Sequence, residues 1–82
     1  MKITLSKQAE KYLNRCDAKT YALLEMAIDN LIAGKGNVAK IQGKPNTYRL
    51  KRPPYRIIFR RVGENELYVE GIYPRGDAYK KG

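Results

Sequence analysis

Apolar and polar residues alternate most regularly between Thr47 and Phe59, in the stretch TYRLKRPPYRIIF. In an extended chain successive side chains point to opposite faces, so Tyr48 and Leu50 share one face while Arg49 and Lys51 share the other. After Pro53-Pro54 the alternation resumes, and the face opposite the apolar one carries two arginines: Tyr55, Ile57 and Phe59 alternate with Arg56, Ile58 and Arg60. The pattern predicts two antiparallel strands with one core face and one cationic face.

Two helices are predicted before these strands. Ser6 and Asp17 are both suited to cap a helix, because a side-chain oxygen can accept a hydrogen bond from an N–H group of the first turn. Gly34 suits the left-handed position that follows a helix. We therefore expect helices from Ser6 to Cys16 and from Asp17 to Ala33. Their apolar stripes follow helical spacing: Ala9, Tyr12, Leu13 and Cys16 in the first, and Tyr21, Leu24, Ala27, Ile28, Leu31 and Ile32 in the second.

The remaining elements are shorter. Residues 1–5 alternate as a first strand, 38–41 form a short apolar patch, and 42–46 are rich in turn residues. A polar turn at 63–66 leads into a strand over 67–73, with Leu67, Val69 and Gly71 on one side and Tyr68, Glu70 and Ile72 on the other. Tyr73 is expected in the core or at an edge, and Pro74 ends the strand.

The predicted order is β-α-α-β-β-β, which indicates an α+β fold with a helical hairpin packed on one face of an antiparallel sheet. The other face stays open and carries Arg49, Lys51, Arg56 and Arg60. With 82 residues, the chain is expected to form a single domain over 1–82.

Composition excludes several classes of site. The chain has one cysteine, Cys16, and no histidine. An intrachain disulfide, a zinc site of His and Cys, and a Ser-His or Cys-His catalytic pair are therefore excluded, and no metal or other cofactor is expected. No signal-peptide or membrane-spanning pattern is present, which predicts a cytoplasmic protein.

The net charge of +9 is unevenly distributed. Residues 1–41 hold seven basic and four acidic residues, whereas residues 42–82 hold ten and four. Such an excess favours a polyanionic partner, either nucleic acid or an acidic protein. A solvated basic surface without a partner is the simpler alternative.

The cationic face has the composition needed to cut RNA without a metal. A lysine can act as a general base where neighbouring cations lower its pKa, and arginine offers a fork of donors to phosphate oxygens. Lys51, flanked by Arg49 and with Arg56 across the hairpin, meets this description. Tyr79 lies in a short polar tail where stacking on a base, or contact with a phosphate, suits it better than core packing.

These segments resemble the C-terminal half of RelE-type toxins in the RelE/ParE superfamily. The matching pieces are a glycine-containing approach to Tyr-Arg-Leu-Lys, the strand Tyr-Arg-Ile-Ile-Phe and the ending Arg-Gly-Asp-Ala-Tyr-Lys. The predicted helical hairpin also fits, so the likeness covers nearly the whole chain.

The resemblance implies a ribosome-dependent mRNA endonuclease that a small acidic antitoxin holds inactive. By position, it implies that Lys51 is the base, that Arg56 stabilises charge at the scissile phosphate, and that Tyr79 orients the substrate nucleotide. Arg75 is implied as a further cation that assists the leaving group. Arg49, Arg60 and Lys80 are the expected substrate-binding residues. The chain departs from the family pattern beside Arg75, where its neighbours are Tyr73, Pro74 and Gly76.

Two other functions fit the same fold. One is a ParE-like inhibitor of DNA gyrase without nuclease activity, which has no need for the set of cations and tyrosine. The other is a nuclease-dead relative that binds RNA or antitoxin. The presence of Lys51, Arg56 and Tyr79 together favours the nuclease.

Overall fold

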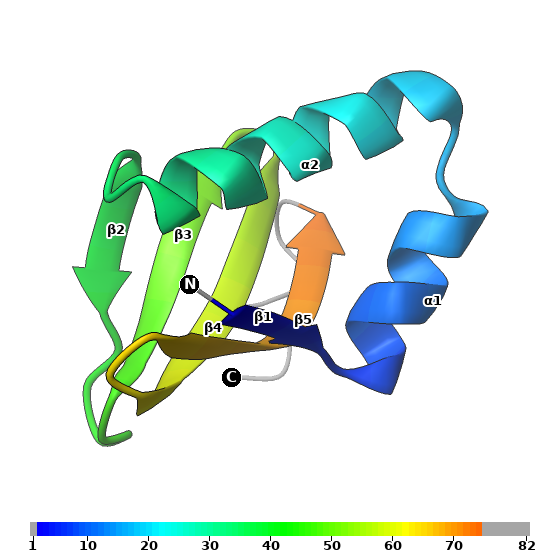
Figure 1. Ribbon diagram of the computed structural model, residues 1–82. Coiled ribbons are helices and arrows are strands. Elements are labelled where there is room, and N and C mark those ends of the chain that lie inside the picture. The colour runs from blue at the N-terminus through cyan, green and yellow to red at the C-terminus, as the bar shows by residue number, and fades with distance from the viewer. Residues whose placement is uncertain (1, 75–82) are drawn as a thin grey trace.

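The computed structural model describes residues 2–74. In chain order the elements are β1 (Lys2–Leu5), α1 (Lys7–Arg15), α2 (Ala18–Ile32), β2 (Asn37–Lys40), β3 (Thr47–Arg52), β4 (Tyr55–Gly63) and β5 (Glu66–Pro74). The strands form one five-stranded sheet in the order β1-β5-β4-β3-β2. Figure 1 shows α2 crossing one face of this sheet and α1 lying beside β5. The predicted α+β fold is confirmed.

Two features of the sheet differ from the prediction. First, β2 was not predicted as a strand; its four residues are all exposed, and it pairs antiparallel with β3 at the edge. Because none of its side chains is buried, this edge strand shows no alternation of buried and exposed residues from which a strand could be predicted. Second, β1 pairs parallel with β5, with Ile3 opposite Leu67. The sheet is therefore mixed. Parallel pairing of the first and last strands requires the whole intervening chain to fold back between them.

The two helices begin and end where the sequence predicts. The Ala9 N–H donates to Ser6 Oγ at 3.1 Å, and the Thr20 N–H donates to Asp17 Oδ1 at 3.0 Å. The hydrogen bonds from Thr20 hold the pKa of Asp17 below its ordinary value. After α2, Gly34 takes a φ of 78°, the left-handed conformation expected there.

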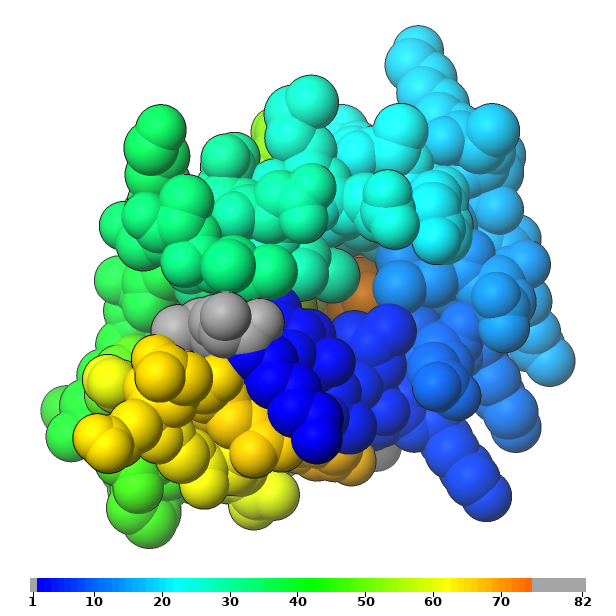
Figure 2. Space-filling model, in the orientation of Figure 1, coloured from blue at the N-terminus to red at the C-terminus, as the bar shows by residue number. Residues whose placement is uncertain are grey.

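The core lies between the helices and the sheet. It is a cluster of buried side chains from α1, α2, β3, β4 and β5: Ala9, Leu13, Leu24, Ala27, Leu31, Leu50, Ile57, Phe59, Leu67, Val69 and Ile72. In Figure 2, which shows the side that carries the helices, the side chains of α1 and α2 form a continuous layer across the top and right of the view.

Two predicted packing residues of α2 are not in this core. Tyr21 is 41 % exposed and Ile32 is 39 % exposed, whereas Leu24, Ala27 and Leu31 are buried. At 3.6 residues per turn, both lie roughly 90–110° around the helix from the centre of that buried arc. The predicted stripe was thus wider than the face that the sheet covers. Tyr12 does pack, with its ring edge-on to Tyr55 at 6.2 Å between centroids.

A bulge in β5 changes which side chains reach the core. Ile72 is opposite Ile57 and Gly71 is opposite Ile58, but the next partner of β4 is Val69, so Glu70 is an extra residue. Val69 and Ile72 are consequently both on the core face, each with no exposed surface. The prediction that Ile72 faces away from Val69 was wrong, because strict alternation ends at the bulge.

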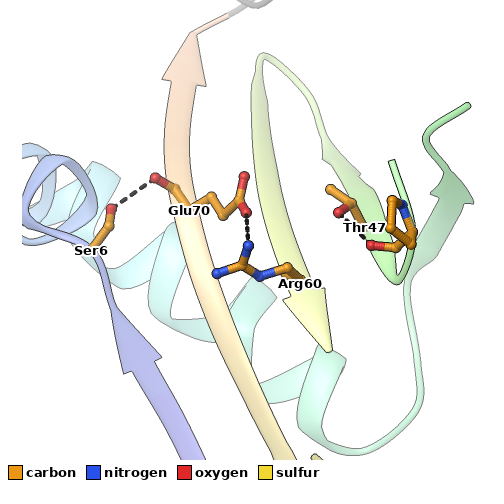
Figure 3. A network of polar contacts seen from close by, with 5 residues as sticks. Ser6, Thr47, Arg60 and Glu70 are labelled. Carbon is orange, nitrogen blue, oxygen red and sulfur yellow. Dashed lines mark hydrogen bonds and ion pairs between the residues drawn. The ribbon is translucent and has the colours of Figure 1, made fainter. Parts of the chain in front are cut away.

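The residues before and within α1 cover the outer edge of β5 where β1 ends. The Ser6 hydroxyl donates to the Glu70 carbonyl at 2.7 Å (Figure 3). The Gln8 side-chain amide both donates to the Ile72 carbonyl and accepts from the Ile72 N–H, each at 2.8 Å. These bonds satisfy backbone groups that a neighbouring strand would otherwise pair, so the bulge is held from outside the sheet.

Within residues 2–74, no helix has both the length and the apolar character needed to cross a membrane.

We predict that Ser6→Ala lowers the free energy of unfolding by about 1–3 kcal/mol, because it removes both the cap of α1 and the hydrogen bond to Glu70. Chemical denaturation monitored by circular dichroism measures this value. Asn14→Ala, at an exposed position of the same helix, serves as the control and is expected to change stability by less than about 0.5 kcal/mol. Equal effects of the two substitutions would contradict the prediction.

Candidate functional site

Three neighbouring rows of side chains on the sheet face away from the helices form what we call the cationic face. Directly opposed residues on neighbouring strands share a face, so each row follows from the pairing register. The rows are Asn37–Lys51–Arg56–Tyr73, Ala39–Arg49–Ile58–Gly71, and Thr47–Arg60–Tyr68–Thr4. The four basic residues predicted for this face are therefore confirmed on one side of the sheet.

Lys51 and Arg56 are direct cross-strand neighbours in the first row. Side chains in such a pair have Cβ atoms roughly 4.5–5.5 Å apart, and like charges there are destabilising. Arg49 lies two residues before Lys51 on the same strand and face, so three cations converge. None of the residues in the three rows is acidic. An anion bound between these side chains would relieve their mutual repulsion.

Burial differs among the three cations. Lys51 is exposed, whereas Arg49 and Arg56 are half-buried. The Nε atom of Arg49 and the Nε and Nη1 atoms of Arg56 are buried. A guanidinium group with buried nitrogen atoms has restricted freedom, so the side chains of Arg49 and Arg56 are more restrained than the exposed side chain of Lys51.

Arg60 is on the same face but is engaged elsewhere. Its Nη1 atom lies 3.4 Å from Glu70 Oε2 (Figure 3), and its guanidinium lies 5.5 Å from the centre of the Tyr68 ring. Along β4 it is four residues, or roughly 13 Å, from Arg56. The structure therefore brings together Arg49, Lys51 and Arg56, and places Arg60 at a distance beside a carboxylate.

A depression of about 400 Å³ opens at the end of the first row. Its lining comes from the start of β2 and from the β3–β4 turn: Asn37, Lys51, Pro53, Pro54, Tyr55 and Arg56. A larger depression of about 510 Å³ lies along α1, away from these rows. The smaller one adjoins both opposed cations, which makes it the better candidate for binding a phosphate and its sugar.

Three of the predicted site residues, Arg75, Tyr79 and Lys80, lie outside the described residues. Two others were not predicted as site residues but share the row of Lys51 and Arg56, namely Asn37 and Tyr73. Tyr73 is not part of the core cluster. Neither residue could be placed here from the sequence, because β2 was not predicted as a strand and because the bulge turns Tyr73 to the face opposite the one that strict alternation predicts. Residues 2–74 contain no group of His, Cys, Asp or Glu that could hold a metal ion.

The chain is similar in structure to RelE toxins. Isolated Escherichia coli RelE toxin superposes with a TM-score of 0.75 at 17 % identity, covering 98 % of this chain and 92 % of that one. The RelB–RelE antitoxin–toxin complex of Methanococcus jannaschii matches with a TM-score of 0.74 at 19 % identity, covering 95 % and 96 %. The archaeal RelE–RelB complex of Pyrococcus horikoshii matches with a TM-score of 0.72 at 24 % identity, covering 93 % and 96 %.

By contrast, no protein-family model and no curated protein matches the sequence.

We predict that Lys51→Thr raises stability relative to Arg52→Thr by about 0.2–1 kcal/mol, because it relieves the repulsion from Arg56. Arg52 is the matched control, since it is a neighbouring exposed cation on β3 that opposes Tyr55 instead of a charge. Denaturant unfolding of both variants at low salt measures the difference. A smaller gain for Lys51→Thr than for Arg52→Thr would contradict it.

The structural likeness establishes that this chain has the RelE toxin fold: two helices on one face of a five-stranded, mostly antiparallel sheet.

Proposed function

We propose that this chain is the toxin of a RelE-type toxin–antitoxin system and acts as a ribosome-dependent mRNA endonuclease. One observation carries the proposal: the opposed pair Lys51 and Arg56, flanked by Arg49, on the helix-free face of a RelE fold. Directly opposed like charges are unfavourable in a sheet, and this pair supplies the positive charge that cleavage of a phosphodiester requires.

The reaction breaks the RNA chain without a metal. The 2′-hydroxyl loses its proton and its oxygen bonds to the adjacent phosphorus. The bond from phosphorus to the 5′-oxygen then breaks, and that oxygen gains a proton. The products are a 2′,3′-cyclic phosphate and a 5′-hydroxyl. Positive charge at the non-bridging oxygens stabilises the phosphorane between these steps.

The described residues are suited to distinct roles. Lys51 is exposed and can approach the 2′-hydroxyl as the general base, while the partly buried guanidinium of Arg56 offers donors to the phosphorane. Arg49 binds the neighbouring phosphate. For Arg75 and Tyr79, leaving-group assistance and substrate orientation remain the roles that the family resemblance implies, with Lys80 and Arg60 as further contacts to the RNA backbone.

Dependence on the ribosome follows from the weak acid–base chemistry of this site. A chain without histidine lacks the side chain whose ordinary pKa is closest to neutral. Rate must then come mainly from positioning, and an mRNA held in the ribosomal A site is already ordered for in-line attack. The protein would act in the cytoplasm, where translating ribosomes are found.

An antitoxin is the second proposed partner. Two of the similar structures described above are complexes of RelE with RelB. With a net charge of +9, this chain would bind a small acidic protein that covers or neutralises the cationic face.

The decisive experiment is 5′-end mapping of an mRNA in a purified translation system. We expect cuts within ribosome-bound codons for the unmodified protein and their loss for Arg56→Ala, because the phosphorane then lacks its donor. Arg61→Ala, an exposed arginine on the same strand that opposes Leu67, is the control and should cut normally. Thermal unfolding of each variant establishes that it is folded.

Absence of cleavage by the unmodified protein would refute the nuclease. Inhibition of gyrase supercoiling in the same preparation would then identify the ParE-like alternative.

Binding of single-stranded RNA should weaken with salt. Each phosphate contact contributes about 0.7 to the slope of log affinity against log salt. We therefore expect Lys51→Ala to flatten the slope by about 0.7, whereas Arg60→Ala changes it less because Arg60 is already paired with Glu70. Fluorescence anisotropy of a labelled RNA carrying 2′-deoxy sugars, which cannot be cut, measures both slopes. Equal slopes for Lys51→Ala and the unmodified protein would show that Lys51 does not contact phosphate.

A further inference from the structure

Tyr73 ends the row that contains the two opposed cations. It is directly opposite Arg56, which is itself opposite Lys51. The bulge at Glu70 is responsible, because it places Ile72 on the core face and so turns the next residue away from the core. A tyrosine at the end of β5 is thereby brought to the cationic face, beside the proposed site of the scissile phosphate.

The ring of Tyr73 lies back over Gly71. A Cβ atom built on Gly71 would be 2.6 Å from both Cε2 and Cζ of the tyrosine, closer than real Cβ atoms come to other atoms. Glycine is therefore required at position 71 for the ring to occupy this place. Gly71 belongs to the second row with Arg49 and Ile58, so the ring covers the β5 end of that row.

This position is not accounted for by core packing. Tyr12, Tyr48 and Tyr55 are packed against the hydrophobic core, whereas Tyr73 is on the other face of the sheet and is partly exposed. An aromatic ring laid along a sheet beside basic side chains is the arrangement on which single-stranded nucleic acids stack their bases.

We propose that Tyr73 contacts the substrate directly, as the stacking surface for a nucleobase of single-stranded RNA next to the phosphate bound by Lys51 and Arg56. The inference rests on the proposed nuclease function and adds a residue to its site. The base and phosphate of one nucleotide are joined through a single sugar, so a phosphate at Arg56 brings a base within reach of the neighbouring ring. Stacking requires the aromatic ring and does not require its hydroxyl.

The test is cleavage of mRNA on programmed ribosomes, with kcat and KM measured separately for several variants. Tyr73→Phe keeps the ring and should cut within about threefold of the unmodified protein. Tyr73→Leu removes it and should lower kcat/KM roughly 5- to 150-fold, the range expected for one lost stack. The loss should be mainly in KM, because stacking is present in both the bound substrate and the transition state.

Gly71→Ala provides an independent perturbation that displaces the ring and retains it in the chain. The added methyl group meets the far end of a flexible side chain, so the ring can move without unfolding the sheet. Gly71→Ala should therefore lower kcat/KM in the same direction as Tyr73→Leu. In the double variant Gly71→Ala/Tyr73→Leu, the alanine should cause no further loss, because there is no ring left to displace.

The outcomes separate the inference from the function on which it rests. Cleavage by the unmodified protein together with equal kcat/KM for Tyr73→Leu would overturn the stacking role alone. A loss for Tyr73→Phe as large as for Tyr73→Leu, or a loss in kcat alone, would also overturn it. If Tyr73→Leu does not fold, normal cleavage by folded Gly71→Ala would overturn it. Absence of cleavage by the unmodified protein would refute the nuclease function and the inference together.

Discussion

The register of the C-terminal half of β5 against β4 depends on one extra residue, and that register decides which side chains of this half lie on each face of the sheet. Because Glu70 has no direct partner on β4, Val69 and Ile72 both reach the core, and Tyr73 reaches the opposite face. A β5 strand without the bulge would place Ile72 on the cationic face and Tyr73 against the helices. Ser6 and Gln8 hold the bulged segment from its outer side, so the start of α1 contributes to positioning Tyr73.

The cationic face combines two kinds of charge environment. Arg60 has a carboxylate at 3.4 Å and an aromatic ring beneath its guanidinium, a combination that adds to stability in the absence of any ligand. Lys51 and Arg56 oppose each other directly, and repulsion between directly opposed like charges is unfavourable for stability. Like charges brought together on one face of a sheet are typical of binding and catalytic sites, which often depart from the arrangement that stability alone would favour.

The RelE toxin fold appears here with identities of 17–24 % to the solved structures described above. Such low sequence identity is compatible with one fold. A core requires apolar side chains of suitable total volume at the right positions, and many sequences satisfy this requirement. Function is more demanding, since it requires particular side chains at particular points of the sheet.

Much of the architecture is determined by local signals in the sequence. Both helix caps, the left-handed Gly34 and the alternation of β3 and β4 act over a few residues, and the structure confirms each of them. Lys51 and Arg56 could be placed opposite each other because the hairpin around Pro53-Pro54 brings them together within a few residues.

Only the tertiary structure determines the features that depend on contacts between segments far apart in the chain. The edge strand β2 exists because β3 offers hydrogen bonds to an exposed segment, and β1 becomes parallel to β5 only through packing of residues far apart in the chain. The facing of Ile72 and Tyr73 was likewise decided by a bulge, which is stabilised by Ser6 and Gln8, 64 residues from their partners Glu70 and Ile72. Strand pairing, unlike helix capping, is a property of two segments, and neither segment specifies its register alone.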